Sequence, residues 1–161
     1  MIIFLYTVFF LVLAGPATSE VSFARLLHEN SFAKDRFFGG LEINLSLSQG
    51  VPYKMSFSED PISLIIDFNV VSFDEIGSQK INQSKNIKLI KLEELGSKWS
   101  RVSIQLKDYW DIENTEMRIN PNDNSALISI LLKSISKDVF KSKNANAKNF
   151  LKSENLKELE K

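Results

Sequence analysis

The sequence predicts an all-β fold, a pseudo-symmetric two-sheet β-sandwich whose two similar halves hold three to four strands each. Two observations lead to this prediction: apolar and polar residues alternate with a period of two in several short segments, and Gly, Pro, Asn and Asp turns separate these segments. A third observation is that the order of segments occurs twice along the chain. A helical or disordered tail is expected after the last strand.

Residues 1–19 have the features of a secretory signal peptide. Residues 2–13 are uncharged, and as a helix they would rise about 18 Å, well short of a hydrocarbon core of about 30 Å. Ala17 and Ser19 suit a signal-peptidase cut before Glu20, although no Lys or Arg precedes the apolar run. The sequence therefore predicts export, and a short membrane anchor that stays attached is the alternative.

Residues 20–39 are expected to form an N-terminal extension. They show no clear period over their full length, although Phe23, Leu26 and Leu27 could lie on one face of a short helical turn. A Gly-Gly pair ends this segment.

The sandwich itself is expected over residues 40–132, and its first half holds three strands. The first strand alternates strictly between apolar and polar residues, which indicates one buried face. The third carries apolar residues on both faces, which indicates deeper burial. With Pro-containing turns between them, the expected strands are 41–47, 53–57 and 64–68.

The second half repeats this order after a polar connection. Ile43 to Ile66 spans 23 residues and Val102 to Ile128 spans 26, the difference matching a longer Pro-Asn-Asp-Asn turn. The duplication favours a sandwich in which the inward residues of each half bury those of the other. Chance similarity between two three-stranded meanders is the alternative. The expected elements are the connection 74–86 and strands at 87–92, 102–106, 117–119 and 127–132.

Residues 133–161 differ in composition and are expected to form a basic tail or linker. They hold eight Lys and four acidic residues, a net charge of +4, with few apolar residues. This composition is typical of a loosely helical or disordered segment. A solvated linker is favoured over a segment that binds anionic envelope polymers.

The composition argues against several classes of chemistry. The chain has no Cys and one His, His28, which excludes thiol nucleophiles and sites that need two imidazoles. Lys and Arg total 20 and Asp and Glu total 20, so charge offers no argument for nucleic-acid binding. The adjacent acidic pairs 59/60 and 93/94 would diverge rather than face each other across a cleft. We therefore expect no catalytic residue, no metal site and no cofactor.

Large amphipathic rings near strand ends are candidates for ligand stacking. They are Tyr53, Trp99, Tyr109 and Trp110. The alternative is that one Trp packs in the core and the other caps it.

Two charged residues are further candidates. Arg101, beside Trp99, could form two parallel hydrogen bonds with a ligand carboxylate. Asp67 lies within an apolar strand, where burial would raise its pKa. An Asp67 that points outward or is hydrogen-bonded within the protein is favoured over a buried carboxylate with a raised pKa.

Residues 40–132 resemble the AMIN domain, the N-terminal module of periplasmic N-acetylmuramoyl-L-alanine amidases, in its alphaproteobacterial form. The resemblance rests on LSQGVPY at 47–53, LIIDF at 64–68 and WSRV at 99–102. It implies a periplasmic β-sandwich of two similar halves that binds peptidoglycan and targets amidase activity to the division septum. The ligand-binding residues that we expect are Trp99, Arg101, Tyr53 and Asp67.

The resemblance also implies a difference between the two halves. In the family an Arg commonly precedes a Leu-Val-Val-Asp-type strand. Ser63 stands in that place in the first half and Arg101 in the second, whereas the first half keeps Asp67 and the second has Gln105. If the outer faces bind glycan, the first face would do so without a guanidinium.

Three functional hypotheses remain open. The first is a non-catalytic peptidoglycan-binding or targeting module, whose further partner is an amidase catalytic domain or a divisome protein. The second is an N-terminal fragment of an amidase, because the zinc domain that normally follows needs two His and a Glu, and this chain has one His. The third is an envelope protein-interaction scaffold that uses exposed sheet edges. The adjacent coding sequence would separate the first two.

Overall fold

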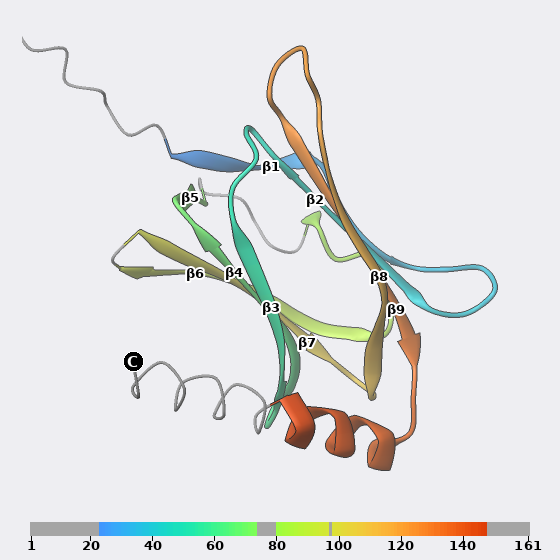
Figure 1. Cartoon of the computed structure of the whole chain (residues 1–161). Coiled ribbons are helices and arrows are strands. Elements are labelled where there is room, and N and C mark those ends of the chain that lie inside the picture. Colours follow the sequence, from blue (N-terminus) through green and yellow to red (C-terminus); the bar gives the residue numbers. More distant parts are fainter. Residues whose placement is uncertain (1–22, 74–79, 97, 148–161) are drawn as a thin grey trace, which may run out of the picture.

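Two β-sheets packed face to face make up most of the structure (Figure 1). The structure is a computed structural model and describes residues 23–73, 80–96 and 98–147. Apart from one helix near the C-terminal end of the described part, the regular elements are strands. The predicted all-β, two-sheet fold is therefore confirmed, while the predicted signal peptide at 1–19 lies outside the described residues.

The two sheets differ in size, and all neighbouring strands are antiparallel except β1 and β5. The larger sheet has the order β5-β1-β2-β9-β8, with β5 at Val71–Ser72, β1 at Ala24–Asp35, β2 at Leu41–Leu47, β9 at Ala126–Ser134 and β8 at Trp110–Ile119. The smaller sheet has the order β3-β4-β7-β6, with β3 at Tyr53–Glu59, β4 at Ile62–Asn69, β7 at Trp99–Leu106 and β6 at Ile87–Gly96.

The core lies between the sheets and follows from the alternation along the strands. On β7, Val102, Ile104 and Leu106 are buried, and the residues between them face outward or are partly exposed. Strand β9 alternates in the same way. Burial of one such aliphatic side chain stabilises the fold by about 1.5–3 kcal/mol. Buried side chains of both sheets form one continuous cluster.

The duplication seen in the sequence is present in the strand pairing, but the halves are interleaved. Strands β1–β4 form one unit and β6–β9 the other: β1 pairs with β2 as β6 pairs with β7, and β3 pairs with β4 as β8 pairs with β9. The units exchange strands, since β2 pairs with β9 and β7 with β4. Each sheet therefore contains strands of both halves, and the halves are not separate layers.

Strand β1 corrects the expectation of a short helical turn in the N-terminal extension. Its register against β2 shifts between Leu27 and Phe32, so the period of two is interrupted in the middle of the strand. The Ser31 hydroxyl donates to the Leu27 carbonyl at 2.6 Å and accepts the Ser46 N–H at 2.9 Å. These bonds satisfy backbone groups that the irregularity removes from the ladder.

Register shifts also explain why the observed bounds of two other strands differ from the predicted ones. Strand β8 begins at Trp110, whereas the alternation predicted a strand only at 117–119; its register shifts between Ile112 and Asn114. Strand β6 confirms the predicted strand at 87–92 and extends it to Gly96, with register shifts near both ends. An extra residue in a strand reverses the face of all later side chains, which hides the strand from a period-two pattern.

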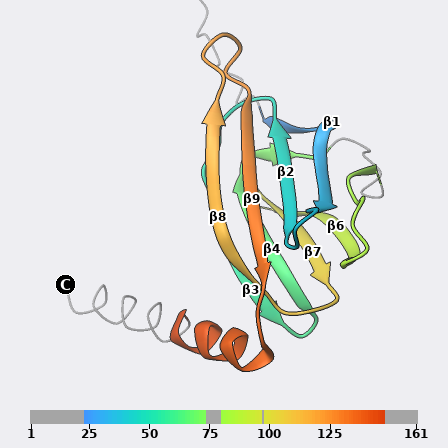
Figure 2. The ribbon, with the colours of Figure 1, turned by 90° about the vertical axis from the view of Figure 1, so that its right-hand side faces the viewer.

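The C-terminal segment is helical at 137–147 and covers one end of the sandwich (Figure 2). The Ser136 hydroxyl accepts the Val139 N–H at 3.4 Å and caps the first turn. The ring of Phe140 is 2% exposed and lies 5.4 Å from Phe57 and 5.3 Å from Tyr109, centroid to centroid. The tail is thus helical over this range, and the buried ring of Phe140 and an ion pair between Lys143 and Asp111 attach it to the sandwich. Among the described residues no helix is long and apolar enough to span a membrane.

Candidate functional site

Four charged residues form a row across the outer face of the smaller sheet. The strand register places Lys54 opposite Asp67, Asp67 opposite Arg101, and Arg101 opposite Glu93. Directly opposed residues of antiparallel strands point to the same face. We call these four residues the charged row; its charges alternate in sign from β3 through β4 and β7 to β6.

The centre of the charged row is a bidentate ion pair. Arg101 Nε donates to Asp67 Oδ1 at 2.6 Å and Nη2 donates to Oδ2 at 3.1 Å. Lys54 Nζ lies 3.7 Å from Asp67 Oδ2. The hydrogen bonds from Arg101 lower the pKa of Asp67, although partial burial opposes this shift, and the bond to Asp67 raises the pKa of Arg101. The Asp67 carboxylate is therefore held ionised, and it fixes the plane of the guanidinium.

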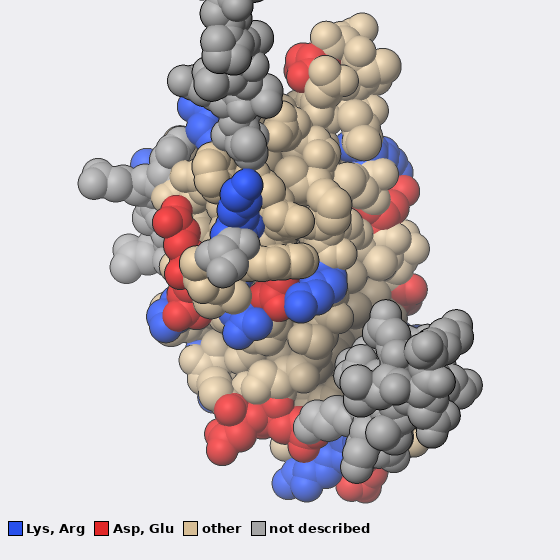
Figure 3. Space-filling model, turned by 60° about the vertical axis from the view of Figure 1, so that its left-hand side comes forward, with Lys and Arg blue, Asp and Glu red and all other residues tan. Residues whose placement is uncertain are grey.

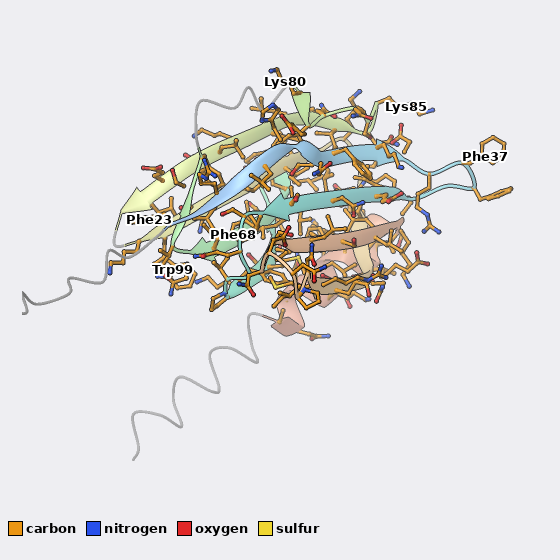
Figure 4. The ribbon with its side chains drawn as sticks, turned by 90° about the horizontal axis from the view of Figure 1, so that it is seen from above. Phe23, Phe37, Phe68, Lys80, Lys85 and Trp99 are labelled. Carbon is orange, nitrogen blue, oxygen red and sulfur yellow. The ribbon has the colours of Figure 1, made fainter. Side chains whose placement is uncertain are left out.

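Trp99 lies beside the charged row at the start of β7. It precedes Arg101 by two residues and so shares its face. The ammonium of Lys54 lies 5.0 Å from the centroid of the Trp99 ring, within the range of a cation–π contact. The turn before Trp99 needs positive φ at Gly96 (75°) and Lys98 (66°). Figure 4 places Trp99 and Phe23 at the same end of the sandwich.

Two hollows border Trp99. The outer hollow, about 260 Å³, lies on the sheet face and is lined by Lys54, Asp67, Leu95, Gly96, Trp99 and Arg101. The end pocket, about 530 Å³, lies where the start of β1, β5 and the β6–β7 hairpin meet; it is lined by Phe23, Arg25, Val71, Ser72, Glu94, Gly96, Lys98, Trp99 and Ser100. The indole thus separates a charged surface from a more apolar pocket.

The structure brings together three of the four predicted ligand-binding residues and separates the fourth. Tyr53 lies opposite the fully buried Phe68 and points inward. Its ring lies 6.2 Å from that of Phe68, and its hydroxyl lies 3.4 Å from Thr115 Oγ1 on the other sheet. Tyr53 therefore bridges the two sheets and does not join Trp99, Arg101 and Asp67 on the outer face.

For Asp67 and for the two Trp residues, the structure decides between the two forms that the sequence left open. Asp67 takes the form that the sequence favoured: the carboxylate faces outward and accepts two hydrogen bonds from Arg101, and its pKa is lowered, not raised. Trp110 is 5% exposed and belongs to the core, whereas Trp99 is partly exposed at the surface. One Trp thus packs inside, as the alternative to stacking stated.

The sequence predicts Asp67 on the outer face of the first half and Arg101 on that of the second, and this separation is wrong. The two residues come from different halves of the sequence, but β4 and β7 are neighbours, so the residues meet on one face. Lys54 and Glu93 were not predicted as site residues. Lys54 does occupy a polar position of the alternating strand 53–57, but only the pairing register shows that it faces Asp67.

The face around the charged row carries both signs of charge. Figure 3 brings the side of Figure 1 that holds β4 and β6 toward the viewer, and positive and negative groups lie next to each other there. Within the described ranges no group of three His, Asp or Glu residues could hold a metal ion. The arrangement is suited to binding a polar or anionic ligand beside an aromatic ring.

Two comparisons with known proteins bear on this site. The family model of the AMIN domain matches residues 36–130, which include the charged row and Trp99. No curated protein matches the chain.

Proposed function

Because the chain belongs to the AMIN-domain family, we propose that it is a periplasmic module that binds peptidoglycan and targets cell-wall amidase activity to the septum. AMIN domains are non-catalytic modules known in periplasmic amidases and other envelope proteins. The outer hollow beside Trp99 is the binding site that we propose. Its support is the presence of one aromatic ring and two cations, from Lys54 and Arg101, around one surface hollow.

Arg101 would bind a carboxylate with the guanidinium edge that Asp67 does not use. Asp67 takes the Nε–H and one N–H of Nη2, so the Nη1 donors and the second N–H of Nη2 remain for a ligand. The Asp67 side chain is 9% exposed, so its role is to position Arg101. Lys54 supplies a second cation beside it. The stem peptides of peptidoglycan carry carboxylates that match these two cations.

Trp99 is the residue on which the proposal depends most. An indole at the rim of a hollow offers a flat surface for a sugar ring or a peptide, and such rings commonly account for much of the binding free energy at an interface. Trp99 borders both hollows, so a ligand in either one would contact it.

Co-sedimentation with purified sacculi tests this proposal. We expect the protein to pellet with sacculi, and Trp99→Ala and Arg101→Ala each to weaken binding about tenfold or more, as for interface hot spots. Phe37→Ala and Arg118→Ala are matched controls: Phe37 is 94% exposed at the opposite end of the sandwich (Figure 4), and Arg118 lies on the larger sheet. If sacculi leave all the protein in the supernatant, or if the controls weaken binding equally, the proposal is wrong.

Septal targeting calls for a separate experiment in cells. A fluorescent fusion of the full chain should concentrate at the division septum, and the Trp99→Ala fusion should lose this pattern. An envelope scaffold that is recruited by a protein partner would keep its septal position in the Trp99→Ala variant, and cross-linking in cells would then identify the amidase or divisome partner.

A further inference from the structure

We propose that the edge strand β6 pairs antiparallel with the β6 strand of a second copy of this chain, forming a symmetric dimer. In the part of the chain that the structure describes, β6 has β7 on one side and no strand on the other. The inference rests on this edge and is independent of peptidoglycan binding.

The outward side chains of β6 are unusual for an exposed edge. Leu89 and Leu95 are 53% and 46% exposed, and between them lie Lys91 and Glu93. The ammonium of Lys91 donates to Glu93 Oε1 at 2.6 Å. Edge strands are commonly protected by Pro, by charged side chains or by a covering segment, and exposed apolar side chains favour pairing with another strand. Strand β6 contains no Pro, and its four charged residues are two Lys and two Glu, of which Lys91 and Glu93 pair with each other on the outer face.

The outward residues have a self-complementary order: apolar, positive, negative, apolar. An antiparallel pair with Leu92 opposite Leu92 of the second copy puts Lys91 opposite Glu93 and Leu89 opposite Leu95, twice each. A shift by two residues would instead oppose Lys91 to Lys91 or Glu93 to Glu93. Since like charges directly opposite each other destabilise a strand pair, a single register is favoured.

The other sheet edges that the structure describes do not present two exposed apolar side chains on either side of a complementary pair of charges. The free side of β1 is occupied by β5 and by the bridge between Ala33 and Asn82. Strand β3 presents one Lys and two Ser residues outward, and the regular part of β8 presents Asn114, Glu116 and Arg118, with no apolar residue beside the two charges. The apolar pair that flanks complementary charges occurs only on β6 among the strands described here.

Such a dimer would join the two smaller sheets into one continuous sheet. The two-fold axis would run perpendicular to the sheet, so both outer faces would lie on the same side. The two Arg101 residues would then be three strand spacings apart across the sheet and two residues apart along it, about 16 Å in all. The contact is small, and we expect a dimer that forms only at high protein concentration.

Sedimentation of the purified full chain over a concentration series tests the dimer. We expect Lys91→Glu and Glu93→Lys each to weaken dimerisation about tenfold or more, because each creates two like-charge contacts. An equimolar mixture of the two variants should dimerise again, because every charge then faces its opposite. Lys88→Glu is the matched control, since it makes the same change of charge on β6 at a position outside the complementary set. Circular dichroism verifies that each variant is folded.

Three outcomes would overturn the proposal: a wild-type chain that stays monomeric over the whole series, a control variant that is weakened as much as Lys91→Glu, or a mixture that stays monomeric. The register has its own test, because the chain has no Cys. Leu89→Cys mixed with Leu95→Cys should form a disulfide much faster than either variant alone, since identical positions would lie about 20 Å apart. Equal rates in all three samples would contradict the register.

Discussion

At the scale of residues, Asp67 and Arg101 contribute both to the stability of the fold and to the proposed binding site. Each is partly or largely removed from solvent, and each satisfies the other's charge through two hydrogen bonds. Removing one partner of such a pair leaves a poorly solvated charge and costs about 1–3 kcal/mol. The same bonds hold the guanidinium in one plane, so a loss of Asp67 would affect both stability and ligand binding.

Asp67→Asn should reduce the free energy of unfolding by about 1–3 kcal/mol at neutral pH, and by less in acid. The native pKa of Asp67 lies below its ordinary value of 3.8, so its stabilising contribution is complete above that value and is lost as the pH falls through the native pKa. Urea denaturation at neutral pH and at about pH 3 measures the difference. Glu116→Gln is the control, because its ion pair with Arg118 is exposed on the other sheet. An equal loss at both pH values would contradict the assignment.

At the scale of elements, the segment at 80–86 is joined to β1 by the backbone of Ala33 and by the side chain of Asp35. Asp35, at the end of β1, accepts hydrogen bonds from the Ser84 hydroxyl at 2.5 Å and from the Asn86 amide at 2.8 Å. Burial would raise the pKa of Asp35, but these bonds and the Lys85 N–H outweigh it, so the pKa is lowered. The segment at 80–86 is thereby held against β1.

The C-terminal helix should depend chiefly on Phe140, because its other contact with the sandwich, between Lys143 and Asp111, is an ion pair with an exposed Lys. Phe140→Ala removes the ring that contacts Phe57 and Tyr109, so we expect the helix at 137–147 to detach while the sandwich stays folded. Amide hydrogen exchange should become faster in the helix and remain slow in β2 and β9. Val139→Ala is the control on the same helix, since Val139 is 43% exposed. Slow exchange in the Phe140→Ala helix would show that other contacts hold it.

At the scale of the whole molecule, the two sequence halves depend on each other for every central strand pair. Strand β2 needs β9, and β4 needs β7, and each partner comes from the other half. An isolated half would expose the apolar faces of its strands and lack neighbours for two of them. The sandwich is therefore one cooperative unit, although its sequence is duplicated.

Cutting the chain in the connection at 74–86 should yield two fragments that are unfolded alone and fold when mixed. The first would hold β1–β5 and the second β6–β9, so every inter-half pair would be missing from each. Far-ultraviolet circular dichroism of the fragments and of their mixture is the measurement. A fragment with a cooperative thermal transition of its own would show that one half is an independent domain.

Much of the strand content could be predicted because alternation determines which side chains of a strand face the core. The segments 41–47, 64–68, 102–106 and 127–132 all lie within observed strands. Where a register shift interrupts the alternation, as in β1, the strand could not be recognised from its pattern. Of the candidate site, Trp99, Arg101 and Asp67 were identified from residue type and position, whereas Tyr53 proved to face inward.

The sequence by itself determined the all-β class, the duplicated order of the strands, and the lack of Cys and of a second His that rules out several kinds of reactive centre. Only the tertiary structure decided which strands are neighbours. A period of two assigns each side chain to a face, but the partner of a strand depends on how the complete core packs. Lys54, Asp67, Arg101 and Glu93 are up to 47 positions apart in the sequence, and only the pairing of β3, β4, β7 and β6 places them in one row.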